Sequence, residues 1–178
     1  QMRRAASIPR LPVRDGGPFA SHDHDHGDDA HHDAATGTVD GHLWLDPLNA
    51  VAIARSAAAV LAEADAENAG IYQTNAIEFA AEMEMLVAEI TDRLAPVRNQ
   101  RFLVFHDAYQ YFESRFDIPA AGSIALHDTD LPGPARMAEI HARVRDQGLV
   151  CAFAEPQLNS SLMDTALEGT GTHRADLD

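Results

Sequence analysis

The sequence contains one cysteine, Cys151, among its 178 residues. A single thiol cannot close a disulfide within the chain, and it cannot supply the several thiolates of a zinc-finger type of site. Cys151 lies in the apolar run 149–154, where a cysteine usually behaves as a small hydrophobic side chain. We therefore expect Cys151 to be buried, and its presence indicates little about the redox compartment.

Basic residues and long hydrophobic runs are also scarce. The chain has 13 basic residues against 28 acidic ones, which gives a formal net charge of −15. A negative field of this size opposes binding to nucleic acid and to anionic membrane surfaces, and it concentrates cations near the protein. The longest apolar runs, such as residues 57–62, are far shorter than a membrane span. We expect a protein that neither binds nucleic acid nor spans a membrane.

The first residues contain no apolar stretch of the kind that a secretory signal peptide requires. Residues 1–4, Gln-Met-Arg-Arg, lead directly into a polar segment that contains proline. Export cannot be inferred from the chain itself. We expect either that a signal was removed or that the chain is a fragment.

Histidine is abundant in one place. Five of the ten histidines fall within residues 22–32, where they are interleaved with aspartates: His22, His24, His26, His31 and His32. Imidazole suits zinc, copper and nickel at neutral pH, so this density indicates metal handling. The alternating spacing and the flexible Gly27 favour a loose, fast-exchanging collector of metal over a closed structural site. An expression tag or a solvated polar loop remains an alternative, because the signal is compositional.

The first half of the chain predicts an irregular segment followed by helices. Residues 1–40 resemble a loop, and the alternation in 41–45 predicts a short strand that carries His42. Asp46-Pro47 is typical of an N-cap and a first helical residue, and a helix should run from 48 to 64. A second helix is expected over 65–96. At the rise of an α-helix it would be about 45 Å long, which is long enough to join two lobes.

The second half, residues 97–178, alternates short apolar runs with amphipathic stretches, as in a parallel α/β sheet. The pattern predicts strands over 101–105, 118–126 and 149–154 with a fourth beginning at 172, and helices over 108–116, 133–147 and 160–167. Ligands of open α/β sheets gather at the carboxyl ends of the strands, where His106, Glu155 and Asp178 fall. We interpret Glu155 as capping a turn or neutralising a neighbour rather than as a ligand.

Four blocks in this order resemble a known family. They are GHLWLDP at 41–47, VFHDAYQYF at 104–112, FAEPQ at 153–157 and EGTG at 168–171, preceded by the histidine-rich loop. Together they are similar to the zinc-binding periplasmic components of ABC importers, the ZnuA-type cluster A-I solute-binding proteins. The resemblance implies an α/β fold of two lobes joined by a rigid helix, with 41–64 as part of the amino-terminal lobe, 65–96 as the linking helix and 97–178 as the carboxy-terminal lobe.

The resemblance also implies a site and a role. His42 and His106 match family histidines that bind zinc, and Asp178 matches a carboxylate near the metal, as a weak ligand or as a neighbour of the ligands. The function implied is capture of Zn²⁺ in the periplasm and transient delivery to an ABC permease in the inner membrane, without enzymatic activity. Residues 22–32 would then act as an accessory collector beside the principal site.

The chain departs from the family pattern at both ends. Another family histidine comes from the first half of the amino-terminal lobe, and no residue here aligns with it. The family's strand and helix that follow Asp178 have no counterpart either, nor has any cysteine that could pair with Cys151. We therefore expect a fragment of the family fold that binds zinc more weakly than an intact relative.

Three alternatives stay open. Manganese or iron capture by the same class of protein would favour more carboxylate ligands than two histidines offer. A metal buffer would need only the histidine-rich loop. A zinc hydrolase could use His42, His106 and Asp178 around an activated water, although no motif such as His-Glu-x-x-His places a general base beside that metal.

Overall fold

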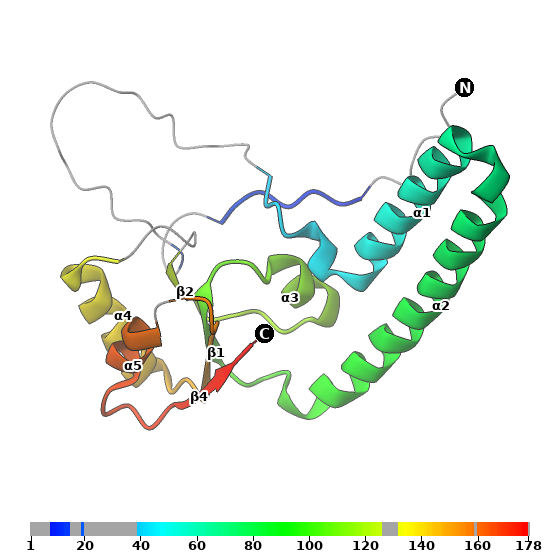
Figure 1. The fold of residues 1–178 in the computed structure, drawn as a ribbon. Coiled ribbons are helices and arrows are strands. Elements are labelled where there is room, and N and C mark those ends of the chain that lie inside the picture. The colour runs from blue at the N-terminus through cyan, green and yellow to red at the C-terminus, as the bar shows by residue number, and fades with distance from the viewer. Residues whose placement is uncertain (1–7, 15–18, 20–38, 126–131, 159, 178) are drawn as a thin grey trace, which may run out of the picture. The chain divides into compact units, whose positions relative to one another are not determined.

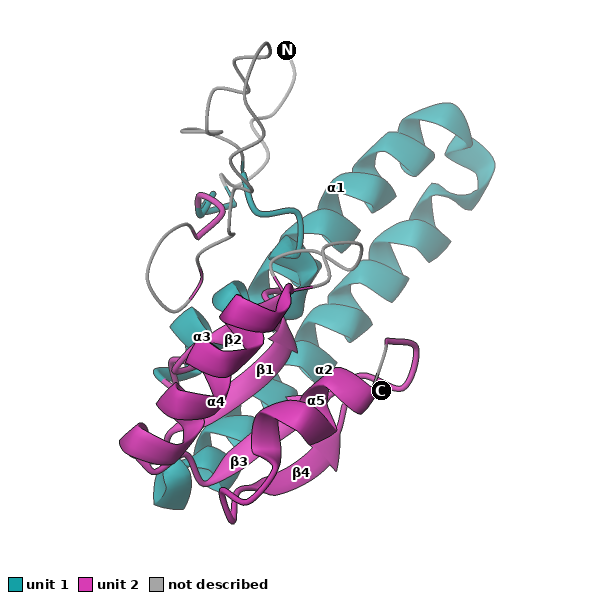
Figure 2. Ribbon diagram, turned by 90° about the vertical axis from the view of Figure 1, so that its left-hand side faces the viewer, with its two compact units in different colours: residues 1–11, 39–98, 109–117 teal, residues 12–38, 99–108, 118–178 magenta. Residues whose placement is uncertain are grey.

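The computed structural model describes residues 8–14, 19, 39–125, 132–158 and 160–177. The chain forms two compact units, shown in different colours in Figure 2. Unit 1 comprises residues 1–11, 39–98 and 109–117, and unit 2 comprises residues 12–38, 99–108 and 118–178. The loop expected over 1–40 lies largely outside the described residues.

A helical hairpin dominates unit 1. Helix α1 (Pro47–Ala64) leads through the short 3-10 helix η2 (Ala66–Asn68) into α2 (Ala69–Leu94), and η3 (Ala95–Val97) follows. The helices α1 and α2 lie side by side in opposite directions (Figure 1), and small buried side chains line their packing: Ala58, Ala76 and Ala80. The helices predicted over 48–64 and 65–96 are therefore confirmed within a few residues.

The bend between the two helices is held by Asp65. Its carboxylate accepts hydrogen bonds from the Asn68 side chain and from the Tyr72 hydroxyl, both at 2.8 Å, and these bonds lower the pKa of Asp65. Because the bend turns α2 back along α1, α2 packs within unit 1. Its expected role as a link between two lobes stays a prediction.

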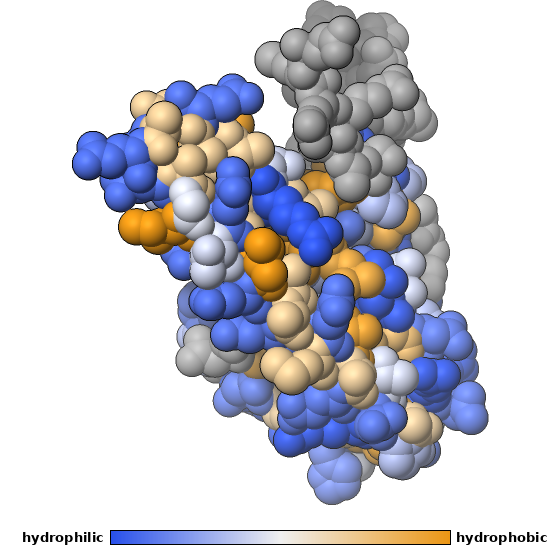
Figure 3. Space-filling view, turned by 90° about the vertical axis from the view of Figure 1, so that its right-hand side faces the viewer, coloured by the Kyte–Doolittle hydropathy of each residue, from blue (hydrophilic) through white to orange (hydrophobic). Residues whose placement is uncertain are grey.

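Several large apolar side chains of the hairpin are exposed, among them Val60, Ile77 and Met85. Figure 3 shows apolar residues on the viewed face separated by polar ones. Scattered apolar residues of this kind are ordinary on protein surfaces and indicate no binding site by themselves.

The prediction of a strand over 41–45 is wrong. Leu43–Leu45 forms a 3-10 helix, η1, with His42 at its N-cap. The reason is local: the Asp40 carboxylate accepts a hydrogen bond from the His42 backbone N–H at 2.9 Å, which turns the chain before a strand can begin. The Leu45 N–H then donates to the His42 carbonyl at 3.0 Å and closes the first turn.

Asp46 joins α1 to a second element of unit 1. As predicted, it caps α1, and its carboxylate accepts from the Leu48 N–H at 2.9 Å. The same carboxylate accepts from Arg115 Nε at 2.8 Å and Nη2 at 2.6 Å, which raises the pKa of Arg115. Arg115 lies on α3 (Gln110–Phe116), the helix expected over 108–116. This pairing helps to explain why residues 109–117 belong to unit 1 and not with the sheet that surrounds them in sequence.

Replacing Asp46 by alanine should lower the free energy of unfolding by about 2 kcal/mol, since a helix cap contributes about 1 kcal/mol and the partly exposed ion pair up to about 1 kcal/mol. Urea titration followed by circular dichroism measures the change. Asp164→Ala is the matched control, because Asp164 pairs with Arg174 in an exposed position. Equal losses in the two variants would show that Asp46 has no special role.

Unit 2 is a four-stranded parallel sheet with helices. The strands are β1 (Phe102–His106), β2 (Ser123–Ala125), β3 (Cys151–Ala154) and β4 (His173–Asp176), in the spatial order β2-β1-β3-β4. The helices are α4 (Pro134–Gln147), which ends at Gly148 with φ 61°, and α5 (Ser160–Leu167). The α/β fold and the parallel sheet expected for 97–178 are confirmed.

The core of unit 2 lies between one face of the sheet and the two helices. Alternate strand residues supply it from β1 and β3, and α4 and α5 supply the rest: Leu103, Phe105, Ala152, Ala154, Ile140, Val144, Met163 and Ala166. Side chains of a strand alternate between its faces, so Cys151 and His106 belong to the opposite face. Cys151 is accordingly half-buried and not buried as expected. Strand β2 is also shorter than the predicted 118–126.

Candidate metal centre

His106 is the last residue of β1, and Glu155 directly follows β3. The parallel register pairs Val104 with Phe153, so two residues further along each strand the side chains of His106 and Glu155 meet on the same face. His106 Nδ1 lies 3.2 Å from Glu155 Oε1 and 3.4 Å from Oε2. Both side chains are buried, with 9 % and 7 % of their surfaces exposed.

The carboxylate determines which nitrogen of His106 can bind a metal. An ionised carboxylate only accepts hydrogen bonds, so Nδ1 carries the proton of the neutral ring and Nε2 carries the lone pair. Glu155 is itself fixed, since Gln157 Nε2 donates to its Oε2 at 3.1 Å. A histidine whose second nitrogen donates to a carboxylate is the usual arrangement of a metal ligand.

The topology also singles out this edge of the sheet. From β1 the chain moves outward to β2, and from β3 it moves outward in the other direction to β4, so the order reverses between β1 and β3. Open α/β sheets bind ligands in the crevice at the carboxyl ends of the strands where the order reverses. His106 is the last residue of β1 and Glu155 directly follows β3, the two strands that flank this point. The sequence suggested that Glu155 serves a neighbouring side chain, and that neighbour is His106, whose Nδ1 lies within hydrogen-bond distance of the carboxylate.

In unit 1, His42 has a similar partner. Its Nδ1 lies 2.7 Å from Asp40 Oδ1, the oxygen that also accepts from the His42 backbone N–H. Asp40 is buried, with 4 % of its surface exposed, whereas the His42 side chain is 30 % exposed. The carboxylate again assigns the proton to Nδ1 and the lone pair to Nε2. The Trp44 ring lies beside the imidazole, with 5.6 Å between ring centroids.

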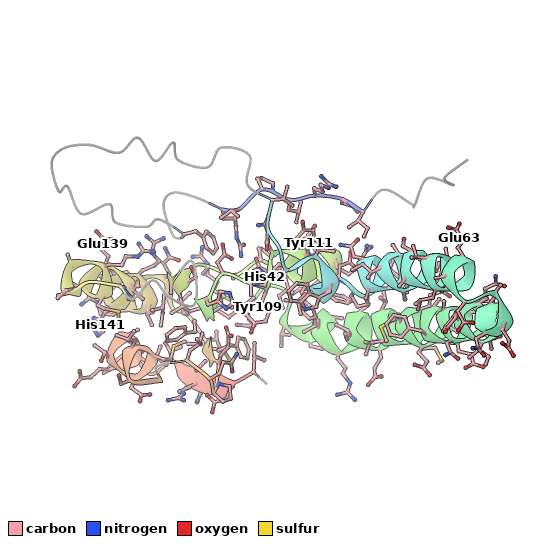
Figure 4. The ribbon with its side chains drawn as sticks, turned by 45° about the horizontal axis from the view of Figure 1, so that its top comes forward. His42, Glu63, Tyr109, Tyr111, Glu139 and His141 are labelled. Carbon is pink, nitrogen blue, oxygen red and sulfur yellow. The ribbon has the colours of Figure 1, made fainter. Side chains whose placement is uncertain are left out.

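Asp40 is held in place by residues that come from elsewhere in the sequence. Gln110 Nε2 donates to its second oxygen at 3.3 Å, and the Tyr111 hydroxyl donates to its backbone carbonyl at 3.2 Å. The Tyr111 hydroxyl also accepts from the Leu11 N–H at 2.9 Å. Figure 4 shows His42 and Tyr111 near the start of α1, with Glu63 at its far end. Tyr111 is buried, and its hydroxyl helps to order Asp40, the partner of His42.

Unit 1 therefore contains one histidine–carboxylate pair and unit 2 contains another. Within the residues that the structure describes, no group of three or more His, Cys, Asp or Glu side chains could hold a metal ion. Asp178 and the loop histidines His22, His24, His26, His31 and His32 lie outside the described residues. His173 is exposed on β4, and His141, labelled on α4 in Figure 4, bonds through Nε2 with the Glu168 carbonyl oxygen at 2.8 Å.

Asp40 is the residue that sequence reasoning missed. Its spacing two residues before His42 was visible, but aspartate is common in turns and the spacing alone carried no signal. Its buried position depends on Gln110 and Tyr111, which follow it by 70 and 71 residues.

None of the helices in the described part of the chain is both long and apolar enough to span a membrane.

Comparison with known proteins gives a consistent result. The ZnuA family profile, described as "Zinc-uptake complex component A periplasmic", matches residues 3–178. The chain is 39% identical to the high-affinity zinc uptake system protein ZnuA of Brucella abortus over an alignment of 196 residues. The alignment covers 98% of this chain and 59% of that protein. It is 38% identical to the ZnuA protein of Paracoccus denitrificans over 132 residues, which cover 74% of the chain and 40% of that protein. The chain thus spans well under two thirds of the length of these relatives.

Solved structures resemble the chain in the same way. A crystal structure of ZnuA superposes with a TM-score of 0.73 at 26% identity and covers 79% of this chain and 55% of that one. A structure of the protein FpvC from Pseudomonas aeruginosa in complex with Mn²⁺ has a TM-score of 0.70 at 25% identity, with coverage of 81% and 55%. Since the family profile covers the chain from its third residue to its last, the chain belongs to the ZnuA family of periplasmic zinc-uptake components.

Proposed function

We propose that this chain is the zinc-binding component of an ABC importer, which captures Zn²⁺ in the periplasm and passes it to a permease in the inner membrane. In this role it binds and releases an ion and catalyses no reaction. The observation that carries the proposal is the pairing of His42 and His106 with buried carboxylates through Nδ1. This pairing orients a neutral imidazole for metal binding and raises its basicity.

We propose His42 and His106 as zinc ligands, with Asp178 as a weaker oxygen ligand. Neutral imidazole binds borderline ions such as Zn²⁺ in preference to Mg²⁺ and Ca²⁺, which select oxygen ligands. The net charge of −15 adds a long-range attraction for cations. The relatives named above as zinc uptake proteins support zinc as the cargo.

Manganese is the second candidate for the cargo, because the chain also resembles FpvC, whose structure holds Mn²⁺. Zinc is favoured by the imidazole ligands, since manganese binds best to carboxylate, carbonyl and water oxygens. A zinc affinity no greater than the manganese affinity would assign the chain to manganese.

We propose that the histidine-rich loop is an accessory collector of zinc. A variant without the loop histidines distinguishes this role from that of a metal buffer, in which the loop would be the main binding site. We consider a variant in which glutamine replaces all five loop histidines, His22, His24, His26, His31 and His32. This variant should lose the weakly bound zinc ions and keep the most tightly bound one. Isothermal titration of the metal-free chain, with a competing chelator for the tight site, measures both classes. Loss of the tightest equivalent in this variant would instead identify the chain as a buffer in which the loop alone matters.

A further inference from the structure

Arg14 and Asp107 form an ion pair next to the candidate ligand His106, and the proposed function makes no use of it. Arg14 Nε lies 3.0 Å from both Oδ1 and Oδ2 of Asp107, and Arg14 Nη2 also donates to Oδ1. Both carboxylate oxygens are therefore engaged by one guanidinium. The Asp107 side chain is 4 % exposed, so this pair lies largely out of water. Planar, two-pronged pairing of this kind is a property of arginine that lysine does not share.

The arginine is held from a second side. Its guanidinium carbon lies 3.9 Å from the centroid of the Phe19 ring, which is the geometry of a cation–π contact. The contact with the ring restricts the plane of the guanidinium, and the ion pair determines which of its N–H groups point at Asp107. Arg14 therefore holds Asp107 in one orientation.

Asp107 lies where the chain leaves the sheet. Its backbone N–H donates to the Ala125 carbonyl at 3.2 Å, and the Ala108 N–H donates to the His106 carbonyl at 2.9 Å, so the backbone turns tightly around Asp107. The alternation of a strand does not constrain a side chain in such a turn. Asp107 is thus a carboxylate that directly follows the proposed zinc ligand His106 in the sequence, and Arg14 holds its side chain.

The cluster contains two buried carboxylates with different partners. Glu155 accepts from His106 Nδ1 and leaves that ring's lone pair on Nε2, whereas Asp107 is engaged on both oxygens by Arg14. A carboxylate that bound the metal would add a hard oxygen ligand, and hard ligands favour manganese over zinc. In the structure both oxygens of Asp107 are instead hydrogen-bonded to Arg14.

We propose that Arg14 is a specificity-determining residue: by binding both oxygens of Asp107, it withholds a carboxylate from the metal bound by His106 and so preserves the preference for Zn²⁺ over Mn²⁺. Arg14 is a positioning residue in this proposal, since it acts on the metal through Asp107. The inference rests on the proposed function, because it requires that His106 binds the ion.

The test compares zinc and manganese affinities in the 178-residue chain, using the metal ions alone and a competing fluorescent chelator. Arg14→Ala should lower the ratio of zinc to manganese affinity about tenfold, because it adds a hard ligand to the site. The double variant Arg14→Ala/Asp107→Asn should restore the ratio of the unmodified chain, because the released carboxylate is removed. Arg174→Ala is the matched control, since Arg174 is another arginine of unit 2 that is paired with aspartate, and it should leave the ratio unchanged.

Other results overturn the inference. If Arg14 has a merely structural role, Arg14→Ala would lower the zinc and manganese affinities by the same factor. A ratio that stays low in the double variant would contradict the proposal as well. If the alanine variant fails to fold, Arg14→Lys replaces it, and an unchanged ratio in that variant refutes the proposal because lysine cannot engage both oxygens in the same plane. Failure of the proposed function is distinguishable, since the unmodified chain would then bind no zinc that depends on His106.

Discussion

His106→Ala should weaken the tightest zinc binding of this chain about 100-fold, and His42→Ala should have an effect of similar size. Four-ligand zinc sites bind with about 10–16 kcal/mol, which averages about 3 kcal/mol per ligand, or about two powers of ten in affinity. Removal of either imidazole also leaves its partner, Glu155 or Asp40, as a buried carboxylate without its histidine. Competition titration against a chelator of known affinity measures the loss.

His173→Ala is the control for this prediction, because His173 is exposed on β4. It should bind zinc as the unmodified chain does. Circular dichroism of each variant shows whether the fold is retained. Tight zinc binding that survives both His42→Ala and His106→Ala would refute the proposed ligands and direct attention to the loop histidines.

Glu155→Ala should weaken zinc binding by about 10–100-fold although Glu155 binds no metal in this proposal, because partners of ligating histidines contribute effects of this size. Without the carboxylate, the proton of His106 is no longer held on Nδ1, and the ring loses both its fixed tautomer and part of its basicity. Glu155→Gln retains an oxygen that can accept from Nδ1 but removes the charge, so its effect should be smaller. Asp40→Ala and Asp40→Asn should give the same order of effects for His42 in unit 1.

The matched control is Glu168→Gln, which removes an exposed carboxylate from the turn after α5. Nitrogen-15 chemical shifts of the His106 ring provide a second readout. The unmodified chain should show a protonated Nδ1, and Glu155→Ala should show a mixture of the two tautomers. Zinc affinity and ring shifts that do not change in Glu155→Ala would show that the hydrogen bond between these side chains has no role in metal binding.

The sequence predicted most of the regular structure because the relevant signals are local. The N-cap Asp46, the spacing of apolar residues in α1 and the terminating Gly148 each act within a few residues of the element they define. The strand predicted over 41–45 failed for a local reason too: a hydrogen bond from the Asp40 side chain competes with extended structure, and alternation of side chains does not register it.

Family membership was also within reach of the sequence, and the comparisons confirmed it. Four short blocks in a fixed order carried that inference, with a histidine in each of the first two. The assignment of His42 and His106 as ligands stays a prediction until the variants are measured.

The sequence by itself determined which histidines to consider, the α/β alternation and the location of His106 at a strand end. Only the tertiary structure decided what each histidine contacts. Glu155 lies 49 residues after His106, Gln110 lies 70 residues after Asp40, and Arg14 lies 93 residues before Asp107. Such pairs form because strand register and helix packing bring distant segments together, and no local pattern encodes them. The orientation of the imidazoles, on which metal affinity depends, is therefore a property of the packed units.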